Sequence, residues 1–110
     1  MKNYKLHLSL QIERDLSEII FYMQKLGTYE SNISTFLDGI YAAFEFLQAT
    51  PLMEQSLDSR VDVPTGMRFY VISQHIIFYE IVGDVIEVPR IIPEKKDYIR
   101  ILGLKEPDNE

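Results

Sequence analysis

Residues 67–92 read MRFYVISQHIIFYEIVGDVIEVPRII, and this stretch determines the fold. It is rich in Ile, Val, Phe and Tyr, which favour β-strands. Two short breaks, Ser73–Gln74 and Gly83–Asp84, divide it into three apolar runs. Breaks of two residues between such runs are typical of tight hairpin turns. The stretch is therefore predicted to form three consecutive antiparallel strands.

The last of these strands contains an unexpected arginine, Arg90, with Pro89 before it and Pro93 a little further on. A buried guanidinium is costly unless it is paired. Because Pro89 has no N–H to donate, we expect a bulge or a sheet edge just before Arg90. Arg90 then either faces a groove or pairs with a carboxylate such as Glu80 on the neighbouring strand.

The N-terminal part predicts a strand followed by a helix. Residues 3–8, NYKLHL, alternate between apolar and polar side chains and predict a half-buried strand of the same sheet. A helix is predicted between Ser9, a candidate N-cap, and Gly27, a natural stop. Its charged side chains, Asp15 among them, are predicted to lie on the solvated face. Its apolar face comprises Ile12, Leu16, Ile19, Ile20, Met23 and Leu26.

A second helix is predicted to have Ser31 or Asn32 as its N-cap and to end before Pro51. Two amphipathic helices with a short linker predict an antiparallel hairpin. Residues 50–66 show no clear period and are predicted to form an irregular connection. The apolar face of the second helix comprises Ile33, Phe36, Leu37, Ile40, Tyr41, Phe44 and Leu47.

The predicted order is β-α-α-β-β-β, an α+β fold whose four-stranded antiparallel sheet is covered on one face by the helical hairpin. With 110 residues the chain suits one domain, predicted to span 1–104, followed by a short acidic tail at 105–110. No apolar run approaches the roughly 20 residues of a membrane span, and no signal-peptide pattern is present. We therefore expect a cytoplasmic protein without a membrane partner.

Composition argues against several classes of function. The chain has no cysteine, which excludes disulfides, thiol chemistry and cysteine metal sites. His7 and His75 are not spaced as metal ligands, and no glycine-rich phosphate loop is present, so neither a metal nor a cofactor is expected. The net charge of −6 argues against non-specific nucleic-acid binding, although residues 59–105 carry seven basic and six acidic side chains.

The sheet half nevertheless contains a set of cationic and phenolic side chains. Because arginine binds phosphate bidentately, such a set could support metal-free RNA cleavage, with tyrosine or lysine assisting proton transfer. The alternative, favoured by the near balance of acids and bases, is a surface ladder of ion pairs with Glu80, Glu87, Glu94 and Asp97. The set comprises Arg60, Arg68, Tyr70, Tyr79, Arg90, Lys95, Lys96, Tyr98 and Arg100.

Several short motifs follow one another in a characteristic order. They are ERDLSEIIFYM in the first helix, FLDGIYAAFEFLQATP in the second, GMR at 66–68, IFY at 77–79, VGD at 82–84, PRII at 89–92 and EKKD at 94–97. Their order and spacing resemble the RelE/ParE superfamily, the toxins of bacterial type II toxin–antitoxin modules. The resemblance covers about residues 4–97 and implies the same β-α-α-β-β-β order.

The resemblance also implies roles for individual residues. Arg68 and Arg90 match the recurrent sheet arginines that help the RelE-like branch to bind and cleave messenger RNA on the ribosome. Tyr98 stands near the place of that branch's terminal tyrosine, so these three are the catalytic residues if the chain is a nuclease. A cognate antitoxin is the implied partner in either branch. The expected binding residues are Arg60, Lys95 and Lys96.

Departures from the pattern favour the ParE-like branch, which inhibits DNA gyrase. Pro93–Glu94 stands where the family often has His-Gly, and few basic residues surround Arg68. A net charge of −6 is also unusual for a protein that enters the phosphate-rich decoding centre. The expected function is therefore that of a growth-arresting toxin acting on gyrase. The alternatives are a ribosome-dependent mRNA endonuclease and an inactive binding module with the toxin fold.

Overall fold

The computed structural model describes residues 3–53, 55–56 and 66–103. The predicted α+β class and the order β-α-α-β-β-β are confirmed, while the short elements η1, β2 and α3 were not predicted. Arg60 and the predicted tail at 105–110 lie outside the described residues. In chain order the elements are β1 (Lys5–Leu8), α1 (Leu10–Lys25), α2 (Glu30–Ala49), the 3-10 helix η1 (Pro51–Met53), β2 (Gln55–Ser56), β3 (Met67–Ile72), β4 (His75–Val82), β5 (Val85–Pro93) and α3 (Tyr98–Ile101).

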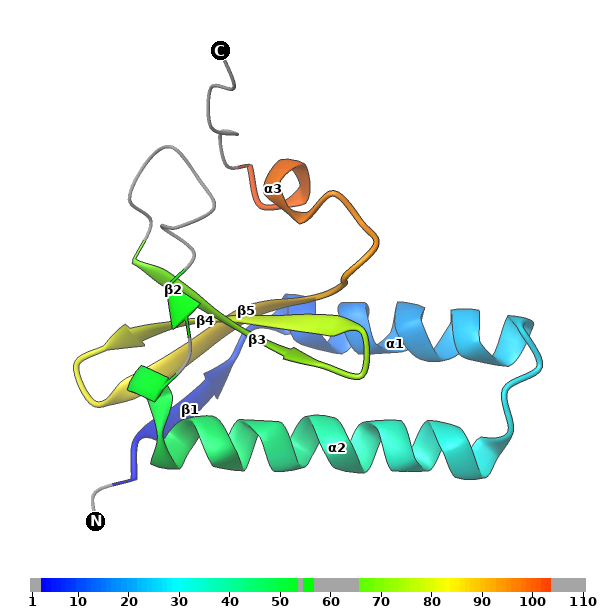
Figure 1. Ribbon diagram of the computed structural model, residues 1–110, viewed down its shortest axis with the longest axis horizontal. Helices are drawn as coiled ribbons and strands as arrows, with labels where there is room; N and C mark the ends of the chain where they lie inside the picture. Colours follow the sequence, from blue (N-terminus) through cyan, green and yellow to red (C-terminus); the bar gives the residue numbers. More distant parts are fainter. Residues whose placement is uncertain (1–2, 54, 57–65, 104–110) are drawn as a thin grey trace.

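The five strands form one sheet in the order β1-β5-β4-β3-β2 (Figure 1). As predicted, β3, β4 and β5 form an antiparallel meander. β1 instead pairs parallel to β5, from Lys5 opposite Val85 to Leu8 opposite Val88. The sheet is therefore mixed, and the prediction of a wholly antiparallel sheet is wrong for β1.

The helical hairpin accounts for the direction of β1. The backbone N–H of Tyr4 donates to the carbonyl of Gln48 at 3.0 Å, and Gln48 Nε2 donates back to the carbonyl of Tyr4 at 2.9 Å. The end of α2 thus lies beside the start of β1. After the short β2, which pairs antiparallel with β3, the chain enters the meander through β3, which runs in the direction of β1. After the two reversals of the meander, β5 runs in the direction of β1.

The ends of the helices follow the predictions in part. Ser9 is the N-cap residue of α1, but its hydroxyl donates to the carbonyl of Pro89 at 2.7 Å and caps no helix amide. α1 ends just before Gly27, whose φ of +79° explains the choice of glycine. α2 begins at Glu30 with Tyr29 as N-cap, slightly earlier than predicted.

Two apolar clusters pack on the two faces of the sheet. The larger one joins α1 and α2 to one face, through side chains such as Ile19, Ile40 and Ile86. The smaller one lies on the other face, where Phe78 and its neighbours are covered by residues in and around α3. Figure 1 shows α2 and α3 on opposite sides of the sheet. Within the described residues, no helix has the length and apolar character needed to cross a membrane.

The turn between β3 and β4 is confirmed at Ser73–Gln74, and both residues have positive φ angles, 49° and 63°. Asn-Gly is the preferred pair where both central residues of a two-residue hairpin turn need this conformation. The double substitution Ser73→Asn/Gln74→Gly is therefore expected to raise the free energy of unfolding by about 1 kcal/mol, measured by chemical denaturation. Asp84→Asn in the other turn, where Gly83 already supplies a positive φ, is the control. An unchanged or lower stability of the double variant would contradict the assignment.

Candidate functional site

Arg90 is held by a buried carboxylate from the first helix. Asp15 is only 3% exposed, and its two oxygens accept hydrogen bonds from Arg90 Nε and Nη2, both at 2.9 Å. The backbone N–H of Ile91 donates to the same carboxylate at 3.0 Å, and Gln11 Nε2 does so at 3.0 Å. We call this group of four residues the Asp15 cluster. It joins two elements 75 positions apart in the sequence.

The predicted bulge before Arg90 is confirmed. Phe78 lies opposite Arg90 and Glu80 opposite Glu87, so two residues of β5 face one residue of β4 at this point. The extra residue changes the alternation of β5, as expected where a proline interrupts the ladder. The bulge therefore determines how the side chain of Arg90 leaves the strand.

Beyond the end of β1, the start of α1 and the residue before it pair with the exposed edge of β5. Beyond Leu8, the last residue of β1, the backbone N–H of Ser9 donates to the carbonyl of Val88 at 3.1 Å. The hydroxyl of Ser9 donates to the carbonyl of Pro89, and the carboxylate of Asp15 accepts a hydrogen bond from the N–H of Ile91. Polar groups in and just before α1 thus satisfy backbone groups that a neighbouring strand would otherwise pair.

The burial of Asp15 corrects an expectation, because its place among the charged side chains of the helix predicted a solvated position. Ile12, Asp15 and Ile19 follow the i, i+3, i+7 spacing of a single helix face, and all three are buried. The spacing itself was thus a signal for a buried carboxylate. A buried carboxylate requires a cationic or N–H partner. Arg90 provides a positive charge and two N–H donors placed to bind both carboxylate oxygens.

The partner of Arg90 also differs from the one expected. Arg90 pairs with Asp15, while Glu80 lies opposite another acid, Glu87. Glu87 in turn is paired with His7 on β1, at a position that is largely exposed. Exposed pairs of this kind contribute little to stability, whereas the Asp15 pair is mostly removed from water.

The other predicted site residues lie in different places. Arg68 on β3 is half-buried and lies opposite Tyr79 of β4 in the strand register. Arg90 on β5 lies opposite Phe78 of β4. Tyr79 and Phe78 belong to the clusters on opposite faces of the sheet, and β4 separates the two arginines by roughly 10 Å. The two arginines therefore leave the sheet from backbone positions on β3 and β5 that are two strands apart.

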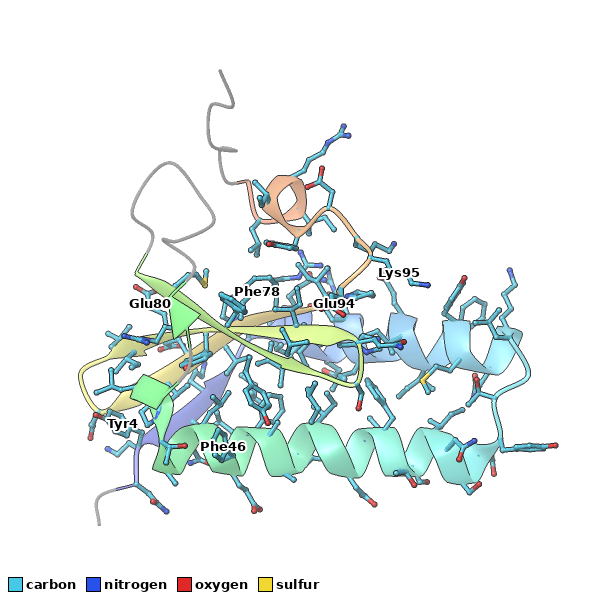
Figure 2. All side chains as sticks on the ribbon, in the orientation of Figure 1. Tyr4, Phe46, Phe78, Glu80, Glu94 and Lys95 are labelled. Atoms are coloured by element: carbon cyan, nitrogen blue, oxygen red, sulfur yellow. The ribbon has the colours of Figure 1, made fainter. Side chains whose placement is uncertain are left out.

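The ring of Tyr98 packs against that of Phe78, with 5.5 Å between the ring centroids. Lys95 and Lys96 are exposed in the connection from β5 to α3, where Figure 2 labels Lys95. The catalytic and binding roles of these residues stay predictions. Among residues 3–53, 55–56 and 66–103, no three His, Asp or Glu side chains are grouped so that they could hold a metal ion.

Comparisons with known proteins agree with this fold. A family model described as "ParE toxin of type II toxin-antitoxin system, parDE" matches residues 6–98. No curated protein sequence matches the chain significantly. Among solved structures, a chain of the chromosomal ParDE toxin–antitoxin system from P. aeruginosa superposes with a TM-score of 0.64 at 17% identity. That match covers 84% of this chain and 98% of the other.

A chain of the toxin–antitoxin complex RelBE2 from Mycobacterium tuberculosis gives a TM-score of 0.55 at 14% identity, covering 83% of this chain and 98% of the other. At these identities, the two structures support the fold alone. The family match is stronger, because it spans most of the chain, from β1 to the start of α3. The chain therefore belongs to the ParE toxin family of type II toxin–antitoxin systems.

Proposed function

We propose that this chain arrests growth as a ParE-like protein inhibitor of DNA gyrase, and that it does not cleave RNA. The observation that carries the proposal is the Asp15 cluster, in which the guanidinium of Arg90 already binds a carboxylate in bidentate geometry. A phosphate would have to compete with this buried acid. The charge that would attract the phosphate is neutralised at a distance of 2.9 Å.

The position of Tyr98 agrees with the same proposal. Its ring packs on Phe78 in the smaller apolar cluster, on the face of the sheet covered by α3. A tyrosine in this position helps to fix α3 on the sheet. Arg68 lies on β3, two strands away from Arg90 on β5.

A cognate antitoxin is the partner we expect, because both similar solved structures come from toxin–antitoxin systems. The exposed hydrophobic side chains of the helical hairpin and of η1 provide surface for such a contact. Those that are more than half exposed are Leu10, Phe21, Tyr22, Leu26, Tyr29, Tyr41 and Leu52.

A ribosome-dependent endonuclease is the second candidate because one observation favours it. Lys95 and Lys96 are both exposed, and they lie in the connection that leads directly to Tyr98. The exposed lysines could bind a phosphate, and the phenol of Tyr98 beside them could donate a proton to it. This arrangement needs no contribution from Arg90.

The two modes are distinguished with the purified chain and purified targets. We expect the chain to inhibit supercoiling of relaxed plasmid by bacterial gyrase and to produce gyrase-dependent DNA breaks. In parallel, a messenger on purified ribosomes should acquire no new ends by primer extension. Omitting gyrase or ribosomes gives the control for each arm. Messenger cleavage with unaffected gyrase would sink the proposal, and a chain that affects neither target would indicate an inactive module.

A further inference from the structure

The outer face of α1 carries four exposed side chains at intervals of four residues, Leu10, Arg14, Glu18 and Tyr22, which we call the α1 ridge. Residues at this spacing form one continuous row on a helix. Leu10 is 87% exposed and Tyr22 is 63% exposed, so neither contributes much to the core. The row therefore has a large exposed apolar side chain at each end and a cation and an anion between them.

We propose that the α1 ridge is the contact between two copies of this chain, related by a two-fold axis that places the two α1 helices antiparallel. The row is self-complementary when it is reversed. Leu10 then faces Tyr22 of the second copy, and Arg14 faces Glu18. A two-fold axis repeats each contact, giving two apolar contacts at the ends and two ion pairs between them.

The distribution of charge favours a second copy as the occupant. Apart from the buried Asp15, the charged residues of α1 are Glu13, Arg14, Glu18 and Lys25, which sum to zero. The chain as a whole carries −6, and α2 contains three acids and no basic residue. The outer face of α1 can therefore meet its own copy without net repulsion, whereas the α2 surface cannot.

Arg14 and Glu18 are available for such pairs, because in the part of the chain that the structure describes neither takes part in an ion pair. An open hollow of about 560 Å³ runs along the same face, lined by Leu10, Glu13, Arg14, Ser17 and Glu18. The short side chain of Ser17 leaves room there between its longer neighbours. In the antiparallel arrangement the hollow receives Arg14 and Glu18 of the second copy.

The size of the contact predicts a weak, reversible dimer. The α1 ridge spans about 18 Å along the helix axis. Contact along one pair of helices over this length is smaller than the roughly 1,600 Å² of a standard specific interface. We therefore expect a dissociation constant of roughly 10–100 μM at low salt. The α1 ridge includes Leu10 and Tyr22, which are also among the exposed side chains offered above as surface for an antitoxin. Gyrase inhibition does not require the dimer, and either can hold without the other.

Sedimentation velocity on the full chain, from about 2 to about 200 μM so as to bracket the expected dissociation constant, tests the proposal. We expect the parent chain to shift from monomer towards dimer over this range. Arg14→Glu or Glu18→Arg alone should weaken the dimer about tenfold or more, because each places like charges opposite one another twice. The double variant Arg14→Glu/Glu18→Arg should restore the parent behaviour. Glu45→Arg on α2 is the matched control and should change nothing, and circular dichroism confirms that each variant is folded.

A chain that stays monomeric at the highest concentration would overturn the proposal, as would a double variant that fails to restore the dimer. The competing occupant is the antitoxin, and the same variants address it. If the single reversals weaken antitoxin binding while the chain stays monomeric, the α1 ridge belongs to the antitoxin interface and the dimer is rejected.

Discussion

Replacing Asp15 with alanine is expected to lower the free energy of unfolding by about 3–5 kcal/mol, the usual cost of removing one partner from a buried ion pair. The loss has two parts. The guanidinium of Arg90, whose side chain is only 26% exposed, loses its counter-charge, and the N–H of Ile91 loses its acceptor. Small domains are stable by about 5–15 kcal/mol, so this change removes a large share of the total.

Urea denaturation followed by circular dichroism measures the effect at about 2 μM protein, where the chain is expected to be monomeric, with Glu18→Ala as the matched control. Glu18 is an acid on the same helix but is exposed, and its removal should change the free energy of unfolding by no more than about 0.5 kcal/mol. A loss below about 1 kcal/mol for Asp15→Ala would contradict the idea that this carboxylate anchors α1 to β5. The difference between the two losses in unfolding free energy reports the effect of burying the carboxylate, because both variants remove one negative charge from the same helix.

The meander could be predicted in detail because its determinants are local. The two turns lie at Ser73–Gln74 and Gly83–Asp84, as the breaks in the apolar pattern indicated. The bulge before Arg90 was also predictable, because Pro89 cannot donate to the ladder. Each of these features depends on residues that are close in the sequence.

The direction of β1 was missed because a strand's apolar alternation is the same in either direction. Consecutive strands joined by a two-residue turn must be antiparallel, but β1 is joined to the rest of the sheet by two helices. The prediction did not take into account that the helical hairpin returns the chain to the start of β1, where Gln48 at the end of α2 is hydrogen-bonded to Tyr4. From β3, which runs in the direction of β1, the two reversals of the meander make β5 parallel to β1.

The candidate site was only half predictable. Arg90 was identified as a residue that needs a partner, but its partner lies on a helix 75 positions earlier and not on the adjacent strand. The contact depends on α1 continuing the edge of β5 beyond Leu8, which no local pattern specifies. Asp15 itself had a local signal, since it shares a helix face with Ile12 and Ile19.

The double variant Asp15→Asn/Arg90→Met is expected to fold with nearly the parent stability and to retain growth arrest. The introduced asparagine would keep an oxygen for the N–H of Ile91, and its amide could bond Gln11 after a flip of that side chain. The introduced methionine keeps the aliphatic volume of the arginine without its charge. Because neutral replacement of a buried ion pair is often close to neutral in energy, we expect a free energy of unfolding within about 1.5 kcal/mol of the parent.

Each single variant, Asp15→Asn or Arg90→Met, leaves one charge without its partner and should be less stable by about 2–4 kcal/mol. Their toxicity would fall because less folded protein accumulates, so a single variant cannot separate folding from chemistry. The double variant can. Induced expression at matched protein level, followed by colony counts, measures the activity.

If Arg90 only anchors α1 to β5, the double variant arrests growth as the parent does. If its guanidinium stabilises a reacting phosphate, the double variant folds but loses about 100-fold or more of its activity, the usual effect of removing such a group. A well-folded, harmless double variant would thus contradict the anchoring role. Retained arrest would show that the charge of Arg90 serves the fold alone, because the folded protein would then act on its target without that charge.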